Sequence, residues 1–349
     1  MKKILTTLCA VAMLAGCTAG GSKKSSTNTA STKEETAATV MVGTGSVTNV
    51  SNKTKEGSDT AAQFDTTFAS VVLEGNVIKY VYFDVAQDKV TYDATGHVTS
   101  DNTASTSKKA LGDKYGMKDK SSIKKEWYEQ VEALEKWAVG KTVEEVLNMP
   151  TTQKDEKHTV SADKDLMTGC TIGVTAFQQA LDKAAKNAVE VKDVASVGSA
   201  ILTQVSGKDA SAEKSGEAKA SSTYGVVALD KDGKVVFTQT DVAQNAVKFT
   251  TAGALDGEAV AIATKGEKKD EYGMKKVSSI GKEWFEQNQA YDDWTVGKTG
   301  KEIADMKVTT NEGGKTVTAD KDLMTGCTIG VDSLQKVTTT AIEAATKLN

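Results

Sequence analysis

The chain has 349 residues, a formal net charge of −4 at pH 7 and no arginine among its 43 basic residues. A mildly acidic chain without arginine is a poor nucleic-acid binder, because neutralising phosphates requires clustered basic side chains. Its two histidines, His97 and His158, have no ligand spacing to a cysteine, which argues against zinc and c-type haem sites.

The N-terminus has the composition of a targeting segment. Lys2 and Lys3 precede an apolar run at residues 4–15, which is shorter than the roughly 20 residues that a spanning helix needs. The run ends in Leu-Ala-Gly-Cys, which resembles a bacterial lipobox. That resemblance implies that residues 1–16 are a signal peptide and that Cys17 is lipidated, so that the chain is anchored to a membrane without spanning it. An ordinary signal peptide with an incidental cysteine is the alternative.

Two segments rich in small polar residues are expected to be flexible. Residues 17–60 and 206–222 consist mostly of Ser, Thr, Lys, Gly and Ala. Such compositions bury too little apolar surface to offset the entropy lost on ordering. We expect a tether at 17–60 and a linker at 206–222 between two domains, at residues 61–205 and 223–349.

Each domain is predicted to begin with strands and to continue with helices. Alternating apolar residues on both sides of a turn predict a hairpin at residues 71–83, and Asp-Lys-Asp-Gly at 230–233 predicts a second one. A helix is expected at residues 121–137, where apolar residues recur at spacings of three and four: Ile123, Trp127, Val131 and Leu134. Later helices are expected at 177–185 and 334–345. This succession predicts α+β domains.

An internal repeat relates the two domains at an offset of 157 positions. Residues 159–174 equal residues 316–331 at 15 of 16 positions. Within these blocks, Asp-Leu-Met-Thr-Gly-Cys-Thr at 165–171 recurs letter for letter at 322–328. Neither histidine has a histidine partner in the other copy, which excludes a shared His-dependent triad. Duplication alone is one explanation, but it explains less well why near-identity gathers around one polar turn.

The repeated turn has features that suit a phosphate group. Gly169 lets the backbone approach another group closely, and Thr168 and Thr171 supply hydroxyls on either side of it. A helix is expected to begin near Thr175, and a helix N-terminus stabilises a phosphate without arginine. The alternative is that the Asp and Thr residues are turn and N-cap residues only.

The motif Asp-x-x-Thr-Gly-Cys-Thr resembles the flavinylation motif of the FMN-binding domain family, usually Asp-x-x-Ser/Thr-Gly-Ala-Thr/Ser. In that family a flavin transferase uses FAD to link FMN, through its phosphate, to the last hydroxyl residue. The resemblance implies that Thr171 and Thr328 each carry one covalent FMN. The other motif positions implied at the cofactor are Asp165, Thr168, Gly169, Cys170, Asp322, Thr325, Gly326 and Cys327. Cysteine replaces the usual alanine, but it is only slightly larger, so we expect no loss of flavinylation.

The arrangement of lipobox, tether and two motif copies resembles the Gram-positive flavin lipoproteins of extracellular electron transfer. This resemblance covers essentially the whole chain. It implies two tandem FMN-binding domains, each a twisted antiparallel sheet with packed helices. It also implies an electron carrier on the extracellular face, which receives electrons from a membrane quinone-linked reductase and passes them to ferric iron or other acceptors. The alternative is a non-redox surface lipoprotein that binds a solute or a protein partner, with the turn purely structural.

Several other residues recur near the motif. Met117 and Met274 each follow a glycine and could line the flavin ring, or fill gaps in the core. The recurring tryptophans Trp127 and Trp284 could stack on the ring, although tryptophan at helical spacing belongs more often to the core.

The cysteines of the two domains are expected to be free. Cys170 and Cys327 occupy the same place in their own copies, so a structural bridge would have to join equivalent sites of two domains. We expect two half-buried thiols.

Overall fold

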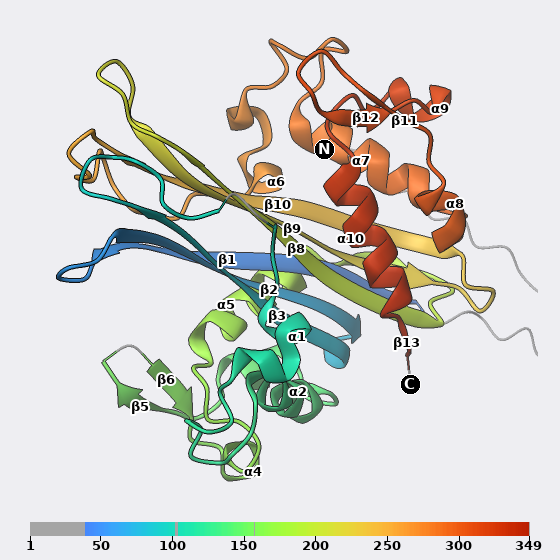
Figure 1. Ribbon diagram of the computed structural model, residues 1–349. Helices are drawn as coiled ribbons and strands as arrows, with labels where there is room; N and C mark the ends of the chain where they lie inside the picture. The colour runs from blue at the N-terminus through green and yellow to red at the C-terminus, as the bar shows by residue number, and fades with distance from the viewer. Residues whose placement is uncertain (1–38, 102–103, 157, 349) are drawn as a thin grey trace, which may run out of the picture. The chain divides into compact units, whose positions relative to one another are not determined.

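The computed structural model describes residues 39–101, 104–156 and 158–348. These belong to one compact unit at residues 37–349, which combines antiparallel sheets with helices, so the α+β class is confirmed (Figure 1). Apart from the short strand at Ala104–Ser105, the same order of elements occurs twice, in what we call the first half, residues 40–191, and the second half, residues 196–348. The expected signal peptide at residues 1–16 and residues 17–38 of the expected tether, including Cys17, lie outside the described residues.

The first half is built on three long antiparallel strands. They are β1 (Val40–Thr54), β2 (Thr60–Glu74) and β3 (Val77–Tyr92), and the short β7 (Val189–Val191) pairs with β1. The strand order is β3-β2-β1-β7. Gly75, with φ of +61°, forms the tight turn between β2 and β3, a conformation that side chains disfavour. The hairpin predicted at 71–83 is confirmed.

The second half repeats this sheet. Its strands are β8 (Ser196–Lys208), β9 (Gly216–Leu229), β10 (Val235–Phe249) and β13 (Thr346–Lys347), in the order β10-β9-β8-β13. The hairpin predicted at 230–233 is confirmed between β9 and β10. One short strand of the first half, β4 (Ala104–Ser105), pairs with β8, so the chain crosses to the second sheet before it returns to the first half.

The flexible segments expected from composition are strands where the structure describes them. Residues 40–60 form β1, a turn and the start of β2, and residues 206–222 form the end of β8, a turn and the start of β9. The prediction of a flexible tether is therefore wrong from residue 40 onward, and the prediction of a flexible linker at 206–222 is wrong as well. The reason is alternation with small residues: Val42 and Ser46 of β1, like Ala218 and Ser222 of β9, are all buried.

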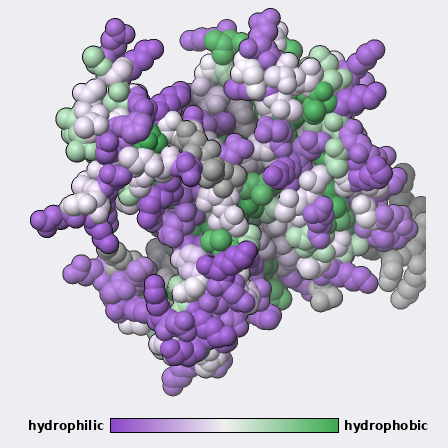
Figure 2. Space-filling view, in the orientation of Figure 1, coloured by the Kyte–Doolittle hydropathy of each residue, from purple (hydrophilic) through white to green (hydrophobic). Residues whose placement is uncertain are grey.

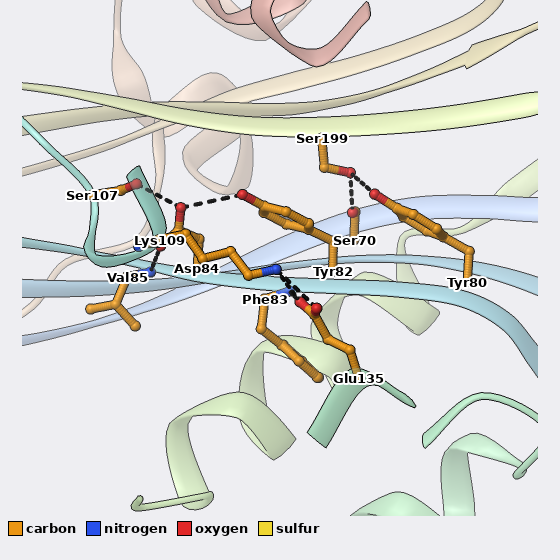
Figure 3. Close-up of polar contacts among 10 residues, drawn as sticks. All are labelled: Ser70, Tyr80, Tyr82, Phe83, Asp84, Val85, Ser107, Lys109, Glu135 and Ser199. Atoms are coloured by element: carbon orange, nitrogen blue, oxygen red, sulfur yellow. Dashed lines mark hydrogen bonds and ion pairs between the residues drawn. The ribbon is translucent and has the colours of Figure 1, made fainter. Parts of the chain in front are cut away.

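The two sheets pack face to face, so the halves share a core. The ring of Phe68 on β2 lies 5.1 Å from that of Tyr224 on β9, measured between centroids. The Ser70 hydroxyl lies 2.5 Å from the Ser199 hydroxyl of β8, and the Tyr80 hydroxyl donates to the same Ser199 oxygen at 3.1 Å (Figure 3). Small residues at these positions allow the two sheets to approach.

Helices cover the outer side of each sheet, as Figure 1 shows. In the first half they are α1 (Lys108–Leu111), η1 (Gly112–Tyr115), α2 (Trp127–Ala138), α3 (Val143–Leu147), α4 (Lys164–Met167) and α5 (Thr175–Lys186). In the second half they are α6 (Lys265–Lys268), η2 (Lys269–Tyr272), α7 (Trp284–Thr295), α8 (Gly300–Ala304), α9 (Lys321–Met324) and α10 (Asp332–Glu343). Two small hairpins are β5 (Thr151–Asp155) with β6 (His158–Ser161), and β11 (Val308–Thr310) with β12 (Thr316–Thr318). The helices predicted at 177–185 and 334–345 correspond to α5 and α10.

The helix predicted at 121–137 begins six residues later than expected, at Trp127. Lys124 has φ of +53°, which a helix cannot contain, and Glu126 caps the helix through a reciprocal contact with Glu129. Ile123 therefore precedes the helix instead of belonging to its apolar face. The remaining members of that face, Trp127, Val131 and Leu134, are buried as predicted.

The surface on the side of Figure 2 is dominated by hydrophilic residues, and hydrophobic residues appear there in small separate groups. The most exposed large apolar side chains of the described residues include Val277 at 84% and Val260 at 52%. No helix among the described residues is long and apolar enough to cross a membrane.

Candidate cofactor site

In both halves the motif folds into one short helix followed by a tight turn. The Asp163 carboxylate accepts hydrogen bonds from the backbone N–H groups of Asp165 and Leu166, at 3.0 and 2.9 Å, and so caps α4. The Thr168 hydroxyl donates to the Asp165 carbonyl at 2.8 Å. Asp320, Asp322, Leu323 and Thr325 make the same contacts around α9. The side chains of Asp165 and Thr168 are exposed, and the contacts seen for these two residues are those of a turn.

The motif glycine allows the turn to lie against the long helix of its half. A Cβ atom on Gly169 would lie 2.7 Å from the Ala133 Cβ of α2, and one on Gly326 would lie 2.8 Å from the Ala290 Cβ of α7. Any side chain at either position would force the turn away from the helix. A Cβ on Gly169 would also lie 3.8 Å from the Lys125 ammonium nitrogen, so a cation stands next to the turn.

The motif cysteines are free and fully buried, instead of half-buried as predicted from the sequence. Cys170 is 1% exposed and Cys327 is 0% exposed, because the close approach of the glycine brings the next residue into the core. Burial raises the pKa of each thiol to about 11. Both thiols are therefore protonated at neutral pH and are poor nucleophiles.

The last threonine of each motif is held by a glutamine of the long helix. The backbone N–H and the hydroxyl of Thr171 both donate to the Gln130 side-chain oxygen, at 2.9 and 3.1 Å. Thr328 makes the same pair of bonds to Gln287, at 2.8 and 3.0 Å. Both threonines are only partly buried. Because each hydroxyl points its proton at the glutamine, its lone pairs face other directions and are available to an electrophile.

The two glutamines are in turn fixed by their own donors. The Gln130 side-chain nitrogen donates to the Ser121 hydroxyl and the Lys125 carbonyl, each at 3.1 Å, and lies 3.5 Å from the Met117 sulfur. In the second half the corresponding acceptors of Gln287 are Ser278, Lys282 and Met274. Gln130 is 0% exposed, so its amide is satisfied entirely within the protein.

Sequence reasoning missed these glutamines, although a signal for them exists. Gln130 stands on the apolar face of α2 between Trp127 and Val131, where a polar residue needs a specific partner. It recurs as Gln287 at the offset of the repeat. Nothing in a single sequence identifies Thr171 as that partner, because the two residues are 41 positions apart.

The loop that carries Met117, and its counterpart with Met274, is held by a carboxylate. Glu126 accepts from the backbone N–H groups of Met117 and Lys118, at 2.8 and 3.1 Å. Glu283 does the same for Met274 and Lys275 in the second half. The structure therefore brings Met117 close to the Thr171 glutamine and Met274 close to the Thr328 glutamine.

In the second half Thr328 lines a cavity of about 1400 Å³. Its lining includes Gln287, Met274, Tyr272 and Trp284, together with residues of β8, β9 and β10. Ser105 and Thr106, from the segment of the first half that crosses to β8, also line it. The lining includes Thr328 but not Thr171. The cavity thus joins the second motif copy to a segment of the first half.

Each half places a lysine beside a tyrosine and a tryptophan. The Lys265 nitrogen lies 5.7 Å from the Tyr272 ring centroid and 5.6 Å from that of Trp284. In the first half Lys108 makes the corresponding contacts with Tyr115 and Trp127, at 5.2 and 5.5 Å. The tryptophans are only 3% and 4% exposed, so both are core residues, and Trp284 also contributes to the cavity wall.

A largely buried ion pair lies between the first sheet and α2 (Figure 3). The Lys109 ammonium group is 2.7 Å from a Glu135 carboxylate oxygen, and the same oxygen accepts from the Phe83 N–H at 2.6 Å. Burial raises the pKa of Glu135 to about 7, against the opposing effect of Lys109. At the repeat offset, the second half has Gly266 and Asp292 instead, so this pair has no counterpart there.

Comparison with known protein families, with curated proteins and with solved structures finds no match for this chain. Among the described residues, no group of three or more His, Cys, Asp or Glu side chains could hold a metal ion. The residues that the structure assembles twice around a partly buried hydroxyl are Thr171 with Gln130 and Thr328 with Gln287.

Proposed function

We propose that the protein is a lipid-anchored electron carrier of the extracellular face, with FMN linked through its phosphate to Thr171 and Thr328. It would consist of two tandem FMN-binding domains, receive electrons from a membrane quinone-linked reductase and pass them to ferric iron or other acceptors. The lipobox resemblance supports the anchor, at Cys17. The motif resemblance supports the flavin.

The observation that carries the proposal is the placement of the Thr328 hydroxyl. It is partly buried, it is oriented by Gln287, and it lines a large cavity that also contains Met274 and Tyr272. Drug-sized ligands occupy pockets of roughly 300–1,000 Å³, so a cavity of about 1400 Å³ has room for a flavin. Lysines in the lining, among them Lys265, suit a phosphate. The residues present therefore fit the group.

Attachment would proceed by transfer from FAD, catalysed by a separate flavin transferase. The threonine oxygen forms a bond to the phosphorus of the FMN portion, the bond to the AMP portion breaks, and the hydroxyl proton leaves with AMP. Gln130 and Gln287 act as positioning residues, because each holds the threonine N–H and hydroxyl together. The attached flavin supplies one- and two-electron chemistry that no side chain of the chain offers.

The test is the flavin content of variants coexpressed with a flavin transferase. Thr171→Ala and Thr328→Ala should each remove one FMN by intact mass, and the double variant should lose the fluorescent band that survives denaturation. Thr171→Ser and Thr328→Ser are matched controls, since they keep the hydroxyl and should keep the flavin. A colourless wild-type protein would contradict the redox proposal, and a double alanine variant with unchanged flavin would contradict the acceptors.

A non-redox lipoprotein that binds a solute or a protein partner remains the second candidate, and one observation favours it. The cavity beside Thr328 is large and contains several lysines, which would also suit a soluble anion in a binding protein. Electron transfer distinguishes the two functions. A wild-type protein that carries no flavin, but binds a small anion, would support the second candidate.

A further inference from the structure

The edge of β1 that faces away from β2 is covered along only part of its length. β7 pairs with residues 40–42. Next along this edge, the Thr44 N–H donates to the Gln239 side-chain oxygen at 2.7 Å, and the Asn187 side-chain nitrogen donates to the Thr44 carbonyl at 3.0 Å. Beyond Thr44, no strand of the described residues pairs with this edge.

A cavity lies against the uncovered part of the edge. Alternate residues of a strand point their backbone groups to the same edge, so those of Ser46 and Thr48 point the same way as those of Thr44. Residues 46–49 of β1 line a cavity of about 390 Å³, together with residues of α5 and residues 261–264. Backbone donors and acceptors of a strand therefore face a space between the two halves.

The same place has a buried hydroxyl that needs a partner. The Ser46 side chain is 2% exposed, and among the described residues its hydroxyl has no hydrogen-bond partner. The Tyr224 hydroxyl lies nearby but donates to Asp241, at 3.3 Å. Buried polar side chains in native proteins nearly always have a partner, so this hydroxyl indicates a polar group that belongs in the cavity.

The equivalent place on the second sheet is filled by a short strand. At the offset of the repeat, residues 46–47 correspond to residues 203–204 of β8. There β4 (Ala104–Ser105) pairs antiparallel with β8, and Ser105 lies opposite Thr203. The Thr203 hydroxyl has a partner as well, because it donates to Asp88 at 2.5 Å. One sheet thus carries a strand where the other has a cavity.

The repeat equivalent of β4 does not fill this cavity. Residues 261–262 line it but form no strand. The Ile262 N–H donates instead to the Asn245 side-chain oxygen at 2.9 Å, and the Ile262 side chain is 48% exposed. The second half therefore does not supply the strand that this edge can accept.

The sequence contains a second copy of the segment that forms β4. Residues 28–32, Asn-Thr-Ala-Ser-Thr, equal residues 102–106 letter for letter. They precede the described part of the chain. This pentapeptide has the same backbone donors and the same small side chains as the segment that pairs with β8. It is therefore chemically suited to the equivalent edge of β1.

The chain is long enough to bring residues 28–32 to that edge. Antiparallel pairing in the register of β4 places Ser31 opposite Ser46. From Ser46 back to Val40 the edge is about 20 Å long, at about 3.3 Å per residue. The nine steps from Ser31 to Val40 span up to about 30 Å, which is enough to pass around β7. Opposite side chains lie on one face about 5 Å apart, so the Ser31 hydroxyl can reach the Ser46 oxygen.

We propose that residues 28–32 add to β1 as a short antiparallel strand beside residues 46–48, as β4 adds to β8. This contact goes beyond the proposed electron carrier and needs no flavin. If Cys17 carries the lipid, as proposed above, docking shortens the link between lipid and fold. The 23 steps from Cys17 to Val40 span up to about 75 Å, and the 11 steps from Cys17 to Asn28 only about 35 Å.

The test is hydrogen exchange of individual backbone amides in the full chain. Ser31→Pro removes an N–H group from the pairing segment, and Ser22→Pro makes the same change outside it. A hydrogen bond of this kind corresponds to roughly a three- to tenfold change in an equilibrium. The Ser46 and Thr48 amides should therefore exchange about three- to tenfold faster in Ser31→Pro than in the wild type, and Ser22→Pro should match the wild type.

A peptide added in trans tests the sequence of the segment. A synthetic peptide of residues 26–34 should slow exchange at Ser46 in the Ser31→Pro variant, and a peptide with the same residues in scrambled order should not. The amides of Val47 and Asn49 point to β2 and should exchange equally in all samples. Equal exchange at Ser46 in the wild type and in Ser31→Pro, whether slow or fast, would overturn the proposal.

Two other outcomes would identify a different occupant of the edge. If Ile262→Pro speeds exchange at Ser46 and Ser31→Pro does not, the segment at 261–262 closes on β1. If slow exchange at Ser46 appears only at concentrations where light scattering detects a dimer, a second copy of the chain supplies the strand. Either result overturns the proposed contact within one chain. Neither depends on flavin, so the outcome is independent of the proposed electron transfer.

Discussion

Gln130→Met removes the side-chain amide that holds Thr171, at nearly constant volume. It breaks the bonds from the Thr171 N–H and hydroxyl, and it removes the donor to the Lys125 carbonyl. Hydroxyl groups can rotate to other partners, but the Thr171 N–H and the Lys125 carbonyl are left without a hydrogen-bond partner. A stranded buried group costs roughly 1–3 kcal/mol, and Thr171 is partly accessible to water, so we expect a loss of about 2–3 kcal/mol.

The assay is urea unfolding of the unflavinylated protein, followed by the flavin content at each threonine after coexpression with the transferase. Gln130→Met should lower the unfolding midpoint with an unchanged m value. It should reduce flavin at Thr171 and leave Thr328 loaded; Gln287→Met should do the reverse. Gln179→Met, at an exposed position of α5, is the control and should change stability by less than about 0.5 kcal/mol.

Two results would refute this reasoning. If Gln130→Met unfolds within about 0.5 kcal/mol of the wild type, the glutamine network does not hold the turn. If stability falls as expected but Thr171 is flavinylated as fast as before, the network is structural and the positioning role is wrong.

Three further predictions concern stability and processing. The pKa of Glu135 is raised to about 7 from 4.5, so the free energy of unfolding of the wild type should fall by up to about 3 kcal/mol relative to that of Glu135→Gln as pH rises from about 4.5 to above 7. Urea unfolding at several pH values measures this difference, and the same pH dependence in both proteins would contradict the prediction. A Cβ at Gly198 would overlap the Ala341 carbonyl oxygen, so Gly198→Ala should lower the free energy of unfolding by about 2 kcal/mol or more, measured by thermal unfolding. Gly313→Ala is the control and should be nearly neutral, because a Cβ there meets no atom closer than 3.4 Å. Cys17→Ser should prevent lipidation, and a variant with the normal lipidated mass would show that the lipobox interpretation is wrong.

Local signals in the sequence determined the hairpins and the later helices. The turn around Gly75 and the apolar face of α5 are set by residues close together in the chain, so both can be recognised from the sequence alone. The repeat also placed the motif turn correctly before α5. The start of α2 was missed, because the backbone at Lys124 takes a positive φ that its residue type does not suggest.

The prediction of flexible segments from composition failed where burial depends on residues far away in the sequence. Residues 40–60 and 206–222 contain mostly small polar side chains, and as isolated segments they have too little apolar surface to fold. In the tertiary structure the opposite sheet covers their buried positions, for example where Ala218 and Ala220 of β9 pack in one cluster with Phe64 of β2. A small side chain there is a requirement for close packing of the sheets, and not a sign of flexibility.

The sequence by itself determined which residues recur, and its motif led to the proposal that Thr171 and Thr328 are the flavin acceptors. Only the tertiary structure decided that Gln130 and Gln287 orient them, that the motif cysteines are buried, and that a segment of the first half lines the cavity beside Thr328. The physical reason is the range of the interactions. Turn and helix patterns depend on neighbours within a few residues, whereas a hydrogen bond across 41 positions or a shared cavity exists only after the chain has packed.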